Sequence, residues 1–226
     1  MAGARPAIEV LVQHLLGAFT ALDQTDQCIS LALYRRLALG SPVALPEIAA
    51  EVKLPLALIE ERVQRWPGVY SDGGQRIIGY WGLSLRPMSH LLRVDGRELY
   101  AWCAWDTLFL PALLGRAVEV SSACRASGQT VRLGVSARAV ERAEPEEVVV
   151  SFLVPQATAV RHDIISNFCH YVHFFASREA AQPWLARNSK VFLLTLNEAF
   201  EVGQRRNHAQ YPALFAMHQR GEQCKA

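Results

Sequence analysis

The sequence lacks any run of apolar residues long enough to cross a membrane. Its longest uncharged stretches flank Asp106 or extend from Ile164 to Ser177, and both fall short of the roughly 18 to 20 apolar residues that a spanning helix needs. Segment 7–19 has no positively charged leader and no small-residue cleavage site, and polar residues interrupt it. We therefore expect an amphipathic helix there, in a soluble, cytoplasmic protein that has no membrane partner.

The chain also lacks a strong charge of either sign. Its 23 basic and 21 acidic residues give a formal net charge of +2, and no long block of like charge occurs. Bulk electrostatics therefore favour neither nucleic acid nor an anionic membrane as a partner. The apolar fraction of 51% in 226 residues is sufficient for the core of one or two globular domains.

Closely spaced cysteine pairs are absent as well. The chain has an odd number of cysteines, separated by wide gaps: Cys28, Cys103, Cys124, Cys169 and Cys224. No Cys-x-x-Cys spacing of the kind that closes a structural zinc site occurs. Together with the missing export signal, this pattern indicates free thiols in a reducing compartment, some of them buried as small hydrophobic residues.

The pattern of residues 1–82 predicts a winged-helix-like helical domain. Helices are expected over 31–39, 46–52 and 56–66, and a hairpin with a glycine-rich turn over 69–80. The second helix of such a motif contacts DNA in many proteins. Segment 56–66, however, carries two acids against two bases, so attraction to phosphate is not evident and we expect no nucleic-acid partner.

Residues 83–226 predict an α+β domain with a mixed sheet and flanking helices. Asp95 and Glu98 have the spacing of a capping box, which predicts a helix that begins there and carries Cys103 and Asp106. Ser177 and Asn197 are expected to cap two later helices. Alternating patterns predict strands over 117–122, 130–136, 148–154, 172–176 and 191–196.

Cys103 and Asp106 form the most informative cluster of the sequence. On a helix, a separation of three residues puts the thiol and the carboxylate on one face, within reach of a shared atom. A lone cysteine in an apolar segment is more often a packing residue. Asp106, by contrast, lies among Trp102, Trp105 and Phe109, where a carboxylate is costly to bury unless it is hydrogen-bonded or functional.

A second buried-looking cysteine, Cys169, would complete a site for a soft metal and an acid. Soft thiolates select soft metals, and two or three sulfurs suit a two-coordinate ion better than tetrahedral zinc. In water a thiol would not give its proton to a carboxylate, because their pKa values differ by about 4.6 units, or roughly 6 kcal/mol. Metal coordination removes this obstacle, and desolvation raises the proton affinity of Asp106. Such a site suits protonation of a carbon bound to a metal and requires no organic cofactor.

Several segments carry a family resemblance. The run Leu99-Tyr100-Ala101-Trp102-Cys103-Ala104-Trp105-Asp106-Thr107-Leu108 is similar to organomercurial lyases, also called alkylmercury lyases. The similarity extends over 111–116, 120–124, 168–169, 172–177, 198–200 and 203–204, and Gly79-Tyr80-Trp81-Gly82-Leu83-Ser84 resembles part of the winged-helix segment of that family. The match is thus spread over most of the chain rather than limited to one short motif.

The resemblance implies that Cys103 and Cys169 bind mercury as substrate and product, that Asp106 shuttles the proton, and that Cys124 is structural. It implies cleavage of alkyl and aryl mercury compounds to a hydrocarbon and mercuric ion, which passes to a mercuric reductase or to excess cellular thiols, without a resident cofactor. We expect a monomer or a homodimer. His170 is a departure, since many family members have a second adjacent cysteine there.

Two other interpretations fit the residues. A soft-metal or redox sensor would combine these thiols with a winged helix that contacts DNA. A structural zinc domain would use Cys169 with His170 or His173. If the segment is a strand, these two histidines point to opposite faces, which favours ordinary polar contacts for both.

Overall fold

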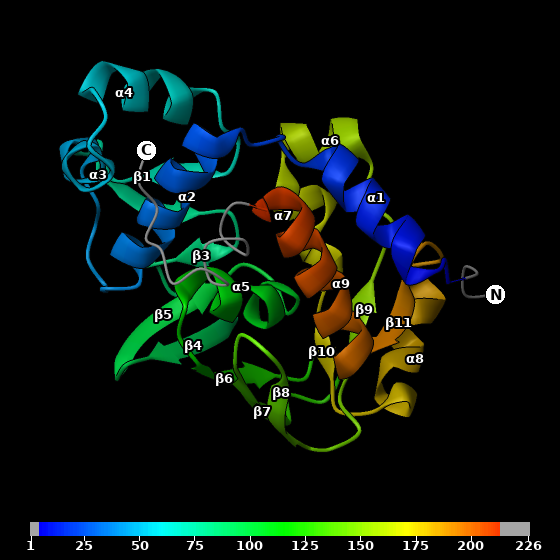
Figure 1. Ribbon diagram of the computed structural model, residues 1–226. Helices are drawn as coiled ribbons and strands as arrows, with labels where there is room; N and C mark the ends of the chain where they lie inside the picture. The colour runs from blue at the N-terminus through cyan, green and yellow to red at the C-terminus, as the bar shows by residue number, and fades with distance from the viewer. Residues whose placement is uncertain (1–4, 213–226) are drawn as a thin grey trace.

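The structure is a computed structural model that describes residues 5–212 (Figure 1). The helices are α1 (Ile8–Ala18), α2 (Gln24–Leu37), α3 (Leu45–Val52), α4 (Leu56–Gln64), α5 (Asp106–Leu114), α6 (Ala157–His162), α7 (Ile164–Asn167), the 3-10 helix η1 (Cys169–Tyr171), α8 (Arg178–Arg187) and α9 (Leu196–Gln210). The strands are β1 (Val69–Ser71), β2 (Ile77–Tyr80), β3 (Leu83–Ser84), β4 (His90–Val94), β5 (Arg97–Ala101), β6 (Val118–Ala123), β7 (Thr130–Val135), β8 (Val140–Glu144), β9 (Val149–Phe152), β10 (Phe174–Phe175) and β11 (Phe192–Thr195). The α+β class is confirmed.

Most strands form one sheet that continues from the N-terminal part of the chain into the later part. Its order is β1-β2-β3-β5-β4-β6-β7-β8, and a second sheet has the order β10-β9-β11. Within residues 5–212 every strand pair of both sheets is antiparallel. The expectation of a mixed sheet was therefore wrong, since each of these strands runs antiparallel to the strands with which it is hydrogen-bonded.

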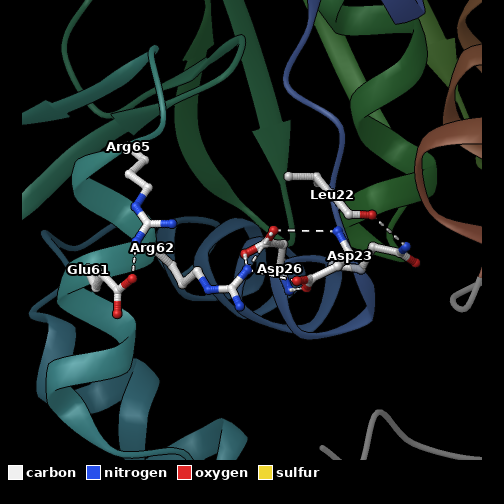
Figure 2. A network of polar contacts seen from close by, with 7 residues as sticks. Leu22, Asp23, Asp26, Glu61, Arg62 and Arg65 are labelled. Atoms are coloured by element: carbon white, nitrogen blue, oxygen red, sulfur yellow. Dashed lines mark hydrogen bonds and ion pairs between the residues drawn. The ribbon is translucent and has the colours of Figure 1, made fainter.

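The N-terminal helices α2, α3 and α4 gather at one end of the molecule (Figure 1). The Asp23 side chain caps α2 by accepting the Asp26 N–H, and the Asp26 side chain accepts the Asp23 N–H, which completes a capping box. Figure 2 shows Arg62 of α4 extending to Asp23 and Asp26. Its Nη1 lies 2.7 Å from Asp23 Oδ2 and 3.2 Å from Asp26 Oδ1. Arg65, which follows the last residue of α4, pairs with Glu61. Both arginines of segment 56–66 are therefore already paired with acids.

A tight hairpin replaces the helix that the sequence predicted from Asp95. Asp95 and Gly96 have φ values of 48° and 77°, and they join β4 to β5. Two consecutive residues with positive φ are typical of a type I′ turn, for which Asp-Gly is a favoured sequence. The helical prediction was therefore wrong for 95–105. Cys103 lies in the turn after β5, and α5 begins only at Asp106.

Helix α9 packs against α5 and holds it in the core. The Trp105 indole N–H donates to the Ala199 carbonyl at 3.0 Å, and the Asn207 side chain donates to the Phe109 carbonyl at 2.9 Å. The cap of α9 is Thr195, which forms a capping box with Glu198, and not Asn197 as expected. The predicted cap at Ser177 of α8 is confirmed.

The expected N-terminal helix is present as α1, beside α9 (Figure 1). Helices α6 and α7 then lead into η1 and the short strand β10. Among the described residues, no helix combines the length and the hydropathy that membrane crossing would require.

Candidate active site

Cys103, Asp106 and Cys169 meet in the core. One ligand atom from each of these side chains lies within 4.8 Å of the other two. The relative exposures are 0% for Cys103, 5% for Asp106 and 4% for Cys169, so the group is almost closed to solvent. Two thiols and one carboxyl group, which are distant in the sequence, thus form a single buried cluster.

The turn between β5 and α5 sets the position of Asp106 relative to Cys103. The Cys103 backbone N–H donates to Asp106 Oδ2 at 2.7 Å. This contact reaches back three residues, as the acidic side chain in the first turn of a helix does in a capping box. The carboxyl group is therefore held by the backbone of the same residue whose thiol it faces.

The backbone brings Cys169 to the same place. Ala104, which follows Cys103, donates its N–H to the Val172 carbonyl at 3.2 Å. Ser151 of β9 holds the segment from the other side, because its hydroxyl donates to the Tyr171 carbonyl at 2.7 Å and accepts the His173 N–H at 2.9 Å. Cys169 begins the 3-10 helix η1. The strand predicted over 172–176 is shorter in the structure, where β10 begins at Phe174.

Burial controls the acid–base properties of the cluster. Desolvation raises the pKa of Asp106 to about 6, against the lowering effect of the Cys103 hydrogen bonds and the Arg206 charge. Desolvation likewise raises the pKa of Cys103 well above its usual range. For Cys169, the Cys103 hydrogen bond lowers the pKa, but desolvation and the charges of Asp106 and Asp163 outweigh it, so the pKa is raised. Both thiols are thus protonated at neutral pH while the carboxyl group is poised to exchange a proton.

Aromatic rings enclose the cluster. The Trp105 ring lies 4.8 to 6.0 Å, centroid to centroid, from those of Phe109, Phe152 and Phe168. Trp102, next to Cys103, makes an edge contact with Tyr70 of β1 at 5.2 Å, and Tyr70 is 42% exposed. The wall therefore excludes water, and its outer part comes from the N-terminal portion of the chain.

Two residues near the cluster were not singled out as site residues from the sequence. Gly82 leaves no room for a side chain beside the Asp106 carboxyl group. Arg206 is 4% exposed, and its guanidinium lies over the rings of Phe19, Phe109 and Tyr211. The periodicity of α9 offered a signal for Arg206, since it continues the buried stripe of Leu196, Ala199, Val202 and Gly203.

The remaining cysteines and histidines lie outside this cluster. Cys124 is buried, and its sulfur accepts the Ala176 N–H at 3.3 Å. Among residues 5–212, the group of possible metal ligands around Cys169 contains neither His170 nor His173. His173 Nε2 is instead 2.7 Å from the His170 carbonyl oxygen. Cys28 is disulfide-bonded, so the expectation of a free thiol was wrong there, and Cys224 lies outside the described residues.

Comparisons with known proteins agree on one family. The family model described as MerB, alkylmercury lyase, matches residues 83–206. The alkylmercury lyase of Staphylococcus epidermidis is 43% identical over 172 residues, which cover 76% of this chain and 78% of that protein. The alkylmercury lyase of Pseudomonas putida is 39% identical over 171 residues, which cover 76% and 79% of the two chains.

A solved structure has a similar fold. The crystal structure described as the mercury-bound form of MerB2 superimposes with a TM-score of 0.69 at 22% identity, covering 88% of this chain and 98% of that one. At this identity the likeness concerns the fold alone. The family match over more than half of the chain and the identity to curated relatives are decisive: this chain belongs to the alkylmercury lyase family of enzymes.

Proposed function

We propose that the protein cleaves the carbon–mercury bond of organomercurials by protonolysis, with Cys103 and Cys169 as mercury ligands and Asp106 as the proton carrier. The observation that carries this proposal is the meeting of two thiols and one carboxyl group within 4.8 Å in a nearly closed site. Two soft sulfur ligands match the preference of a mercuric ion.

In the first stage, a thiol replaces the ligand opposite carbon on mercury. Cys103 or Cys169 forms the sulfur–mercury bond and loses its proton, which the ionised Asp106 carboxylate accepts. Coordination to the metal makes this transfer favourable, because a metal-bound thiol is deprotonated outright. The raised pKa of Asp106, about 6 as a result of desolvation, makes its carboxylate a better acceptor for this proton than an exposed aspartate would be.

In the second stage, the other thiol binds mercury and pushes electron density toward the carbon. Asp106 returns its proton to that carbon as the carbon–mercury bond breaks, so the bonding electron pair forms the new C–H bond. The proton of the second thiol leaves with the displaced ligand X, so that one organomercurial R–Hg–X and two thiols give one hydrocarbon, one bis-thiolate mercuric complex and one HX. The closed wall around Trp105 limits the access of water to this step.

Product release needs a thiol from outside. We propose that excess cellular thiol or a mercuric reductase removes the mercuric ion from the two cysteines by exchange, and that no organic cofactor takes part. Exchange of this kind is open to thiolates because each sulfur ligand binds mercury reversibly. This role would serve detoxification in the cytoplasm.

We further propose that residues 1–82 form a winged-helix-like unit and residues 83–226 the catalytic unit. The order α2, α3, α4, β1 and β2 supports the first part. Use of this unit as a DNA-binding sensor is disfavoured by the pairing of Arg62 and Arg65 with acids (Figure 2). An electrophoretic shift with random duplex DNA at low salt tests this alternative, since salt-dependent binding would support a sensor.

The decisive experiment measures hydrocarbon released from an alkylmercury substrate in the presence of excess thiol. The proposal predicts turnover by the unmodified chain and none by Cys103→Ser or by Asp106→Asn. Arg205→Gln, which removes an exposed arginine outside the cluster, is the control and keeps its turnover. Undiminished turnover by Asp106→Asn would refute the role of the carboxyl group as proton carrier.

A further inference from the structure

Gly82 makes an unusually close approach to the Asp106 carboxyl group. A Cβ atom built on Gly82 would lie 2.6 Å from Asp106 Oδ1 and 2.7 Å from Cγ, well inside the van der Waals contact distance of carbon and oxygen. Gly82 also has φ +95°, in the region that favours glycine. No side chain therefore fits between the backbone of residue 82 and the Asp106 carboxyl group.

Neighbouring contacts hold this backbone segment firmly. The Gly82 carbonyl accepts the Trp102 N–H at 3.0 Å, which ties it to the residue before Cys103. On the other side, the buried Tyr34 hydroxyl donates to the Trp81 carbonyl at 2.9 Å. Trp81 itself has φ 34°, an uncommon value for a residue with a side chain. The segment is thus fixed from both α2 and the site turn.

These contacts restrict the position of the carboxyl group. Oδ2 is held by the Cys103 N–H, and Oδ1 lies where a Cβ on residue 82 would come within 2.6 Å of it. Rotation of the side chain away from the thiols would break the first contact, and a side chain at position 82 would force that rotation. A proton carrier must keep its oxygen within hydrogen-bond reach of both the donor sulfur and the accepting carbon.

We infer that Gly82 is a positioning residue for the protonolysis: its side-chain-free backbone holds the Asp106 carboxyl group in line with the two thiols. This inference rests on the proposed role of Asp106 as proton carrier. It assigns a role in the reaction to a residue between β2 and β3, outside the turn and loop that carry the three reactive groups.

The test is Gly82→Ala, measured for kcat and KM of hydrocarbon release and for the number of mercuric ions bound per chain. We expect kcat to fall about 10- to 100-fold, because a misplacement of about 1 Å costs about that much. KM and the binding of one mercuric ion by the two thiols should stay unchanged, since the three atoms nearest to the added Cβ all belong to Asp106. A general packing defect would instead reduce mercury binding together with kcat, and that result would overturn the inference.

Gly96→Ala is the matched control. Gly96 has φ +77°, so alanine meets comparable backbone strain there, but no atom lies within 4 Å of the added Cβ. Its kcat should match that of the unmodified chain. Equal kcat values for Gly82→Ala and Gly96→Ala would overturn the inference. Full activity of Asp106→Asn would instead refute the proposed function, so the two failures are distinguishable.

A second variant decides the question if Gly82→Ala does not fold. Asp106→Glu keeps a carboxyl group but needs room for one more methylene, in a space that the Gly82 backbone already limits. We expect it to bind one mercuric ion per chain and to lose at least about tenfold in kcat. A kcat close to that of the unmodified chain would show that the carboxyl position is not restricted, and would overturn the inference.

Discussion

The backbone N–H of Cys103 donates a 2.7 Å hydrogen bond to Oδ2 of Asp106, the residue that starts α5. A hydrogen bond to the charged form of a carboxyl group lowers its pKa, whereas burial raises it. In this site the effect of burial is larger than that of the hydrogen bond, and the pKa of Asp106 lies at about 6. The balance between one backbone N–H and the loss of water thus sets the proton affinity on which the proposed reaction depends.

The ionisation of Asp106 should make the rate of hydrocarbon release depend on pH. The initial step needs the ionised carboxylate, and Asp106 is protonated below its pKa of about 6. We therefore expect kcat/KM to be level near neutral pH and to fall about tenfold per unit below about pH 6. Initial rates of hydrocarbon release across that range, corrected for unfolding, provide the measurement. A profile without an inflection between about pH 5 and 7 would contradict the assignment.

The buried Asp106 carboxyl group should also make the free energy of unfolding depend on pH. The folded-state pKa of Asp106 is raised above the unfolded value, so its stabilising contribution is complete below about pH 3.8 and is lost as the pH rises through about 6. The unfolding free energy of the unmodified chain minus that of Asp106→Asn should therefore decrease by roughly 2 kcal/mol between about pH 4 and pH 8. Urea unfolding of both proteins at the two pH values measures it. An increase in this difference would have the wrong sign for a desolvated carboxyl group.

The charge of Arg206 should influence the pKa of the same carboxyl group. Its buried positive charge lowers the pKa of Asp106, and Asn207 beside it anchors α9 to α5. In Arg206→Gln we expect the pKa of Asp106 to rise, so the acidic limb of the rate profile should move to higher pH. The control is Arg205→Gln, since Arg205 is exposed and pairs with Glu9 and Glu201. Profiles of the two variants that coincide would contradict this coupling.

Much of the secondary structure was predictable because it depends on local patterns. Apolar residues at helical spacing and Pro46 near a helix start identified α3 and α4, and alternation identified β6 and β7. The helix predicted over 31–39 covers only the second half of α2, which begins at Gln24. The helix wrongly predicted over 95–105 shows where local patterns are insufficient. The spacing of Asp95 and Glu98 resembles a helix cap, but Asp95-Gly96 satisfies a type I′ turn, and pairing of β4 with β5 decides between them.

The candidate site was only partly predictable. Residue types and the family resemblance pointed to Cys103, Asp106 and Cys169, although Cys103 lies in a turn rather than on a helix. Their meeting depends on long-range contacts such as Ala104 N–H to the Val172 carbonyl, which no local pattern encodes. The contact of Gly82 with Asp106 is likewise a property of the folded chain, because the two residues belong to different elements.

Cys124 should affect stability and not chemistry. Its sulfur accepts the Ala176 N–H at 3.3 Å and lies buried at the end of β6, outside the reactive cluster. We expect Cys124→Ser to lower the unfolding free energy by about 1 kcal/mol, within the usual range for a buried substitution. Thermal unfolding measures this loss. The kcat of the folded variant should be unchanged, and a large fall in kcat would give Cys124 a part in the reaction that the geometry does not support.

The central claim is that both sulfurs hold the metal while Asp106 protonates the carbon. A single-turnover reaction without added thiol tests it most directly, with hydrocarbon counted per chain and mercury coordination read by X-ray absorption. We predict one hydrocarbon per chain, a product mercuric ion with two sulfur neighbours, and no hydrocarbon from Cys169→Ser. Release of hydrocarbon by Cys169→Ser at the rate of the unmodified chain would contradict the two-thiolate account.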